Sequence, residues 1–226
     1  MTLHVSDPQS LADLRVFLER ADRAGVESVR CDARGSRLVV TVPMLAPRGL
    51  LDLTPTVLGI RITELRPGED ADAVVPVRSL LERIAHLSPV HPELTLPPSE
   101  FGASWAGVTP PQGGWERLGT VASAELTRLA SEGARQVAEA LPEQPGAAVL
   151  QRVRAEVWGA PLGVFELPSA VAFAAQSLGF LAEDDAVVYR SAGWHRVSFV
   201  RGHVLVRSQG RGLTPPLDSP ASGVQR

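Results

Sequence analysis

Basic side chains gather near the end of the chain, in a stretch without acidic residues. Residues 186–216 contain five arginines, two histidines and no Asp or Glu, although the whole chain has a net charge of −3. Guanidinium groups bind carboxylates and phosphates through a planar fork of donors. The candidate contacts for an anion or a partner are therefore Arg190, Arg196, His203 and Arg207. The alternative is that these side chains extend into water or reach the acidic residues 183–185, where exposed ion pairs contribute roughly 0 to 1 kcal/mol.

A helix and a three-stranded meander are predicted to position this cluster. The helix over 170–178 follows Pro168 and stops at Gly179, a residue type that suits the left-handed position after a helix end. Apolar alternation and turn residues then predict strands over 186–190, 194–200 and 203–207, with turns at 191–193 and 201–202.

The turn at 201–202 would place Arg196 directly opposite Arg207. Like charges at opposed positions repel, and a bound anion would relieve that repulsion. One face of the meander then carries Val197, Phe199, Val204 and Val206, and the other carries Arg196, Ser198, His203, Leu205 and Arg207.

Three further groups of residues could carry chemistry, and each has a simpler explanation. Residues 102–106 read Gly-Ala-Ser-Trp-Ala, a partial serine hydrolase elbow that lacks its second glycine and follows no strand. His86, His91 and Glu93 could ligate a metal, but their spacing does not put both histidines on successive turns of one helix. The acidic run 183–185 is typical of a solvated turn. We expect no metal and no cofactor.

Composition excludes several catalytic mechanisms. All 22 basic residues are arginine, so the chain has neither a Schiff-base lysine nor a P-loop lysine. The absence of Lys and Asn is typical of a GC-rich bacterial genome. A hydrophobic content of 44% suffices for a buried core, and the single cysteine, Cys31, excludes an internal disulfide. We find no signal peptide and no apolar run of the roughly 20 residues that a membrane span needs, so we expect a cytoplasmic protein.

Residues 1–87 are predicted to form a small antiparallel α/β-layered domain. An amphipathic helix begins after Asp7 and ends near Gly25. Alternating apolar residues predict strands over 28–33, 38–44, 58–63 and 74–75, and a second helix over 80–87 closes the domain.

The rest of the chain is predicted to contain a connector, a second domain and a tail. Residues 88–118 form a Pro/Gly-rich connector, which Trp105 and Trp115 are expected to pin onto one of the domains. Residues 119–207 form a helical domain with the β-meander, and the order of three helices followed by strands is winged-helix-like. Residues 208–226 are expected to be a flexible tail. The predicted fold class is therefore α+β.

These features favour a non-enzymatic protein-interaction or regulatory module, with a protein partner or with self-association as a homo-oligomer. The alternative is a winged-helix DNA-binding transcriptional regulator, in which helix 170–178 would read the major groove. That helix offers no Arg, Lys or Asn to base edges, and residues 119–207 hold eight arginines against nine acidic residues. DNA is therefore the less favoured partner, an enzymatic or small-ligand role comes third, and no membrane contact is expected.

Overall fold

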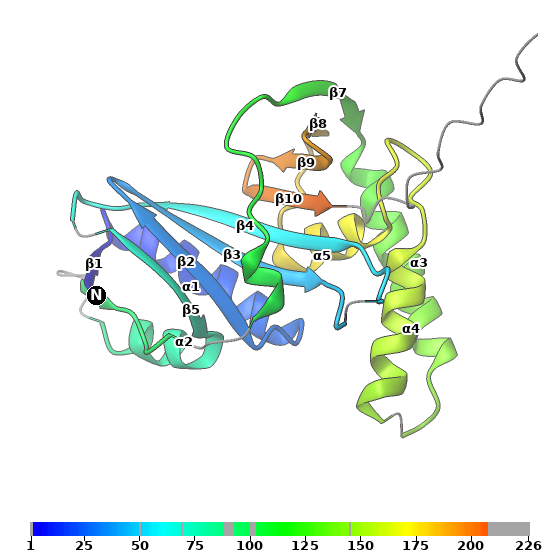
Figure 1. The fold of residues 1–226 in the computed structure, drawn as a ribbon, viewed down its shortest axis with the longest axis horizontal. Helices are drawn as coiled ribbons and strands as arrows, with labels where there is room; N and C mark the ends of the chain where they lie inside the picture. The colour runs from blue at the N-terminus through cyan, green and yellow to red at the C-terminus, as the bar shows by residue number, and fades with distance from the viewer. Residues whose placement is uncertain are drawn as a thin grey trace, which may run out of the picture.

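A computed structural model of the protein describes residues 2–49, 51–68, 70–87, 93–99, 103–144 and 146–207. The chain is an α+β protein in which helices cover one face of a long antiparallel sheet (Figure 1). The helices are α1 (Pro8–Arg23), α2 (Val77–Ala85), α3 (Ser123–Ala140), α4 (Ala147–Gly159) and α5 (Ala170–Leu178), with a 3-10 helix η1 at Ser104–Gly107. The strands are β1 (Thr2–His4), β2 (Ser28–Arg34), β3 (Arg37–Leu45), β4 (Thr56–Glu64), β5 (Ala71–Pro76), β6 (Glu93–Thr95), β7 (Glu116–Val121), β8 (Ala186–Ser191), β9 (Trp194–Phe199) and β10 (Gly202–Arg207).

Eight of these strands form one continuous sheet in the order β5-β2-β3-β4-β10-β9-β8-β7. Every neighbouring pair in it is antiparallel. The two halves of the chain meet at the centre, where His203 of β10 pairs with Ile60 of β4. β1 and β6 form a separate two-stranded sheet. The predicted α+β class is confirmed, and the sheet joins both halves of the sequence.

The two halves of the sheet repeat one arrangement of elements. α1 is followed by the meander β2-β3-β4, and α5 is followed by the meander β8-β9-β10. β5 flanks the first meander and leads into α2, while β7 flanks the second and leads into α3. Because the meanders meet through their third strands, the sheet has the same order of corresponding elements from either edge.

The main core lies between the sheet and its helices. Leu14, Phe17 and Leu18 are buried on the inner face of α1, as their helical spacing predicts. The ring of Phe17 stacks on that of Phe180, directly after α5, at 5.9 Å between centroids. α1 and α5 therefore share one apolar layer that packs against β4.

Helix α5 begins and ends where the sequence predicts, but its surroundings are not those of a recognition helix. Gly179 ends it with a left-handed φ of 70°. Most of its side chains are buried, including Val171, Ala172, Ala175 and Leu178. The winged-helix detail is not confirmed, because the meander is the middle of a larger sheet, with β10 bound to β4 and β8 bound to β7.

The predicted pairing of Arg196 with Arg207 is wrong. β9 and β10 are joined by Val200 and Arg201, so Arg196 lies opposite Leu205 and Arg207 lies opposite Trp194. The turn shifts because Gly202 belongs to the sheet, where a Cβ would stand 2.5 Å from the Phe180 ring. The shift is two residues, and side chains alternate with a period of two, so the predicted division into two faces is retained.

The segment predicted as a connector contains regular structure. β6, η1 and the first residues of β7 all fall between residues 88 and 118. β7 pairs with β8 and forms one edge of the large sheet. The division of the chain into two domains with a connector stays a prediction, and the predicted tail, 208–226, lies outside the described residues.

Candidate functional site

A groove lies on the face of the sheet that the helices leave open. Residues 103–115, which we call the strap, include η1 and cross this face before β7 begins (Figure 1). The cavity between the strap and strands β2, β3, β4, β9 and β10 has a volume of about 530 Å³. Its charged and titratable lining residues are Arg30, Asp32, Arg34, Arg37, Arg196 and His203.

The strap is held against the sheet by an apolar cluster. Leu58, Ile60, Trp194 and Leu205 are buried on the open face of β4, β9 and β10. The strap covers them with Trp105, Val108 and Trp115. Both tryptophans therefore pack on the sheet, but the cluster that they cover comes from both halves of the chain and not from one predicted domain. Ile60 and Leu205 of this cluster also line the groove.

Arg196 lies between two aromatic rings. Its Cζ atom is 4.7 Å from the centre of the Trp115 ring and 4.6 Å from that of Tyr189. Its Nε atom is buried and has no hydrogen-bond partner among the described residues. Contact with the two rings restrains the guanidinium, and its Nη atoms, unlike the buried Nε, are the donors left for a ligand.

His203 lies beside this arginine in the groove. Its Nδ1 atom is 3.1 Å from the Ser198 hydroxyl, which lies opposite it on β9. Burial lowers the pKa of His203 below its ordinary value of 6.5, and the nearby positive charge of Arg196 lowers it further. Both effects disfavour the protonated imidazolium form of His203.

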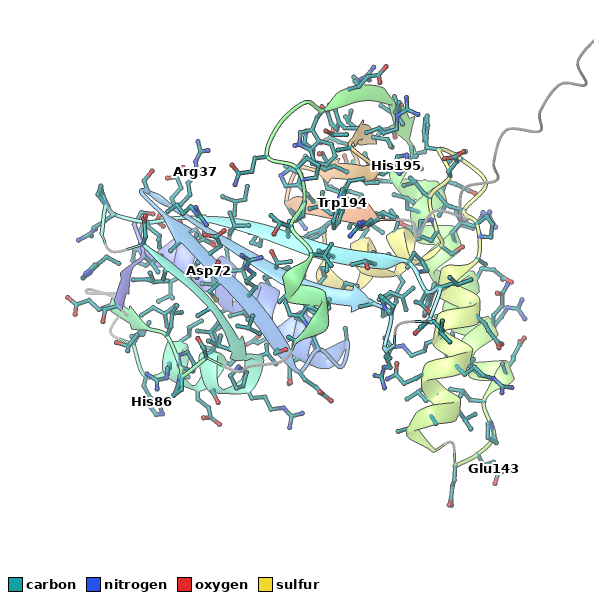
Figure 2. All side chains as sticks on the ribbon, viewed as in Figure 1. Arg37, Asp72, His86, Glu143, Trp194 and His195 are labelled. Carbon is teal, nitrogen blue, oxygen red and sulfur yellow. The ribbon has the colours of Figure 1, made fainter. Side chains whose placement is uncertain are left out.

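The opposite side of the groove comes from β2 and β3. Arg30 makes two bonds with the Asp72 carboxylate, at 2.8 and 2.7 Å, and donates a third to the Ala106 carbonyl of the strap at 3.1 Å. Arg34 pairs with Asp32 at 2.8 Å. Arg37 is exposed near the tip of the β2–β3 hairpin (Figure 2).

Neither Arg37 nor Arg196 belongs to a salt bridge within the described ranges. The groove is therefore lined by four arginines and a single acidic residue, Asp32. Two of those positive charges are without a carboxylate partner in the part of the chain that the structure describes.

The four residues singled out from the sequence do not meet at one place. Arg196 and His203 line the groove, and Arg207 is exposed farther along the same face of β10. Arg190 lies opposite His195 on the helix-covered face and is 3.5 Å from Glu116. Sequence reasoning missed Arg30, Arg34 and Arg37, although the alternation of β2 already directed Arg30 and Arg34 away from the core.

The other candidate chemistry finds no support in the described residues. No group of three potential metal ligands occurs among them. His86 is exposed (Figure 2), Glu93 is 3.9 Å from His4, and His91 lies outside the described ranges, as does Gly102 of the partial elbow. Burial raises the pKa of Cys31 to about 12, which makes its thiol unreactive. No helix in the described ranges has the length and apolarity to cross a membrane.

Two family models match the chain, each over a little less than half of its length. Residues 1–107 match DUF8010 and residues 110–211 match DUF8185, and both are described as domains of unknown function. No curated protein matches the chain in sequence.

Solved structures with a similar fold are DNA polymerase sliding clamps. The Caulobacter crescentus pol III beta is similar over 96% of this chain and 67% of its own, with 14% identity and a TM-score of 0.51. A second structure of the sliding clamp from Caulobacter crescentus is similar over 92% of this chain and 65% of its own, at 15% identity and a TM-score of 0.49. The DNA polymerase III subunit beta from Pseudomonas aeruginosa is similar over 99% of this chain and 69% of its own, with 14% identity and a TM-score of 0.48. The chain thus spans about two thirds of the length of these proteins, and the likeness to the first shows a sliding-clamp-like fold.

Proposed function

We propose that this chain is a non-enzymatic interaction module that binds an acidic segment of a partner protein in the groove beneath the strap. The observation that carries the proposal is Arg196, whose guanidinium lies between Trp115 and Tyr189 with a buried, unpartnered Nε atom. Buried arginines and aromatic residues supply most of the binding energy at protein interfaces.

The surroundings of Arg196 favour an acidic peptide with apolar side chains. Arg37 stands across the groove without a salt-bridge partner among the described residues and attracts carboxylates, while Ile60, Ile62 and Leu205 offer apolar surface between the charges. Carboxylates accept two parallel bonds from a guanidinium edge, and the two Nη atoms of Arg196 can supply such a pair. A partner segment would therefore place a Glu or Asp at Arg196 and an aliphatic or aromatic side chain on the apolar surface of Ile60, Ile62 and Leu205.

DNA is the less favoured occupant. The helix that a winged-helix regulator would insert into DNA, α5, is buried beneath the sheet. The sliding-clamp neighbours share 14 to 15% identity with this chain, and a likeness at that level concerns the fold alone. A groove that bound duplex DNA would do so through phosphates, with affinity that falls steeply as salt rises.

The test is fluorescence anisotropy with a short labelled peptide of Asp, Glu, Leu and Phe. Its comparators are the same peptide with Asn and Gln in place of the acids, and a labelled random duplex. We expect the acidic peptide to bind, Arg196→Gln to weaken it roughly tenfold or more, and Arg190→Gln, on the opposite face, to leave it unchanged.

Three outcomes contradict the proposal. Equal binding of the neutral peptide would mean that the arginines do not select the ligand. Equal affinity of Arg196→Gln and the unsubstituted protein would place the site elsewhere. The third outcome is that the protein binds the duplex but not the peptide, and that added salt and Arg196→Gln each abolish duplex binding. The ligand of the groove would then be DNA and not a protein segment.

A further inference from the structure

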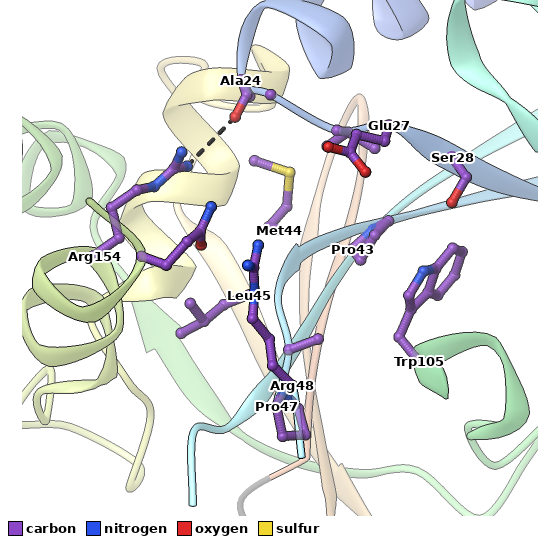
Figure 3. Close-up of a pocket in the computed structure, with 14 residues that line it drawn as sticks. Ala24, Glu27, Ser28, Pro43, Met44, Leu45, Pro47, Arg48, Trp105 and Arg154 are labelled. Carbon is purple, nitrogen blue, oxygen red and sulfur yellow. Dashed lines mark hydrogen bonds between the residues drawn. The ribbon is translucent and has the colours of Figure 1, made fainter. Parts of the chain in front are cut away.

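A second hollow, separate from the groove, opens between α4 and the end of β3 (Figure 3). Its volume is about 500 Å³. Four segments far apart in the sequence line it: the α1–β2 connection, the end of β3 with the residues after it, the strap and α4. A cavity of this size accommodates a small molecule.

Two guanidinium groups point into this hollow from different elements. Arg154 comes from α4 and Arg48 from the segment after β3, and both are drawn in Figure 3. The Arg154 side chain is held in place by a 3.4 Å hydrogen bond to the Ala24 carbonyl and by the Phe173 ring, whose centre is 5.1 Å from Cζ. These two contacts restrain the Arg154 side chain in the absence of a ligand.

The charges of these arginines are not neutralised within the described residues. Neither side chain takes part in a salt bridge there. Asp52 lies near Arg48, but its carboxylate accepts bonds from the Arg48 backbone N–H and from Thr54. Burial lowers the pKa of Arg154, and the positive charge of Arg48 lowers it further. An anion between the two guanidinium groups would offset the desolvation of Arg154 and screen its repulsion from Arg48.

We propose that this hollow binds the phosphate group of a small phosphorylated molecule between Arg48 and Arg154, with the rest of the molecule against Trp105. A phosphate group presents oxygens in several directions and so suits donors that arrive from separate elements, whereas a planar carboxylate is best matched by a single guanidinium edge. Gln151 and Ser28 add polar groups to the lining, and Trp105, Met44 and Pro43 add apolar surface for the non-phosphate part.

The remaining charged group of the lining, Glu27, sets the orientation of the ligand. It lies in the α1–β2 connection, on the side of the hollow near Ser28 and away from the two arginines (Figure 3). Its carboxylate repels the phosphate and accepts hydrogen bonds from hydroxyl or amino groups. The ligand class is therefore a phosphomonoester with a planar or apolar body and a hydrogen-bond donor.

Isothermal titration calorimetry with phenyl phosphate tests this proposal, with benzoate and inorganic phosphate as comparison probes. We expect phenyl phosphate to bind most tightly, because benzoate lacks the phosphate and inorganic phosphate lacks the ring. Arg48→Gln and Arg154→Gln should each weaken phenyl phosphate binding roughly tenfold or more. The control is Arg152→Gln, which removes an exposed arginine of the same helix that pairs with Glu156 at 3.5 Å.

Arg154 also has a structural role, so circular dichroism first checks that Arg154→Gln is folded. Arg48→Gln keeps the test decisive if it is not, because no described side-chain hydrogen bond or salt bridge depends on the Arg48 guanidinium. Absence of binding by phenyl phosphate, or binding that Arg48→Gln leaves unchanged, would overturn the proposal. Benzoate binding as tight as that of phenyl phosphate would overturn the assignment to a phosphate.

Discussion

Gly59 of β4 lies directly against Leu178 of α5, and a Cβ atom at position 59 would overlap the Leu178 Cδ1 atom and touch Val42. This close approach lets the buried helix pack on the centre of the sheet. Arg20 of α1 secures the same helix end, since its Nη1 atom donates to the Leu178 carbonyl at 3.2 Å.

Gly59→Ala is therefore expected to destabilise the protein. The added methyl group has no space between strand and helix, and overpacking of this kind costs about 1 to 3 kcal/mol. Urea unfolding followed by circular dichroism measures the loss. Gly113→Ala is the control, because a Cβ there meets no atom within 4 Å. Equal stability of the two variants would mean that α5 can move away from β4 without cost.

Gly202→Ala tests the register of the central hairpin. A Cβ at this position would stand 2.5 Å from the Phe180 ring and 2.7 Å from the Ile60 carbonyl oxygen, so we expect a loss of about 1 to 3 kcal/mol. Val200→Ser, in a turn position that is 75% exposed, should stay within about 0.5 kcal/mol of the unsubstituted protein. If Gly202 instead occupied the turn, as its sequence neighbours indicate, alanine would be tolerated there and the observed pairing would be wrong.

Asp7 should make the stability of α1 depend on pH. Its carboxylate caps the helix by accepting from the Ser10 N–H at 2.9 Å and from the Ser10 and Ser6 hydroxyls. These hydrogen bonds, the Ser10 hydroxyl first, lower the pKa of Asp7 to about 2. A carboxyl whose pKa is lower in the folded state stabilises that state above its unfolded pKa, and this contribution is lost as the pH falls through the folded pKa.

The comparison for this prediction is Asp7→Asn, which retains an acceptor but not the charge. At about pH 5 the unsubstituted protein should have a higher thermal midpoint than Asp7→Asn, and the difference between the two midpoints should shrink as the pH approaches about 2. Thermal unfolding by circular dichroism at several pH values measures it. A difference that does not vary with pH would mean that the charge of Asp7 contributes nothing to the cap.

Arg30→Gln should loosen the strap. Arg30 connects Asp72 of β5 to the Ala106 carbonyl, so its loss removes the bond between β2 and the strap. We expect faster chymotrypsin cleavage at Trp105 and a red shift of tryptophan fluorescence. Arg34→Gln is the matched control, since Arg34 lies on the same strand and pairs with Asp32. Similar cleavage rates in both variants would show that the apolar cluster alone holds the strap.

Local sequence signals identified most of the elements, and the strand order of the C-terminal meander, but not the pairing between the two halves of the chain. The cap at Asp7, the apolar spacing of α1 and the glycine after α5 are properties of short segments, and these helices form as expected. The short strand expected at 74–75 is the longer β5, and β7 was missed because its few apolar residues have no clear alternation. Pairing β4 with β10 brings together residues from 143 (His203 and Ile60) to 151 (Arg207 and Thr56) positions apart, and no local pattern encodes such a contact.

The candidate groove was harder to predict for the same reason. Arg196 and His203 were identified from their own strands, but Arg30, Arg34 and Arg37 join them only after the two meanders form one sheet. Arg190 was included because it is near in sequence, yet its side chain falls on the other face. The predicted pairing of Arg196 with Arg207 depended on placing Gly202 in the turn. Gly202 instead lies in β10 against the Phe180 ring, and a hairpin pattern in the sequence cannot reveal that contact.

The central seam between β4 and β10 has a consequence for any attempt to study the halves separately. A cut between residues 107 and 110 would leave each fragment with a full-length strand whose backbone donors and acceptors have lost their partners. Each fragment alone is therefore expected to aggregate through its exposed strand. When the two fragments are produced together, we expect them to reassemble into a native-like protein, because the exposed edges of β4 and β10 are complementary.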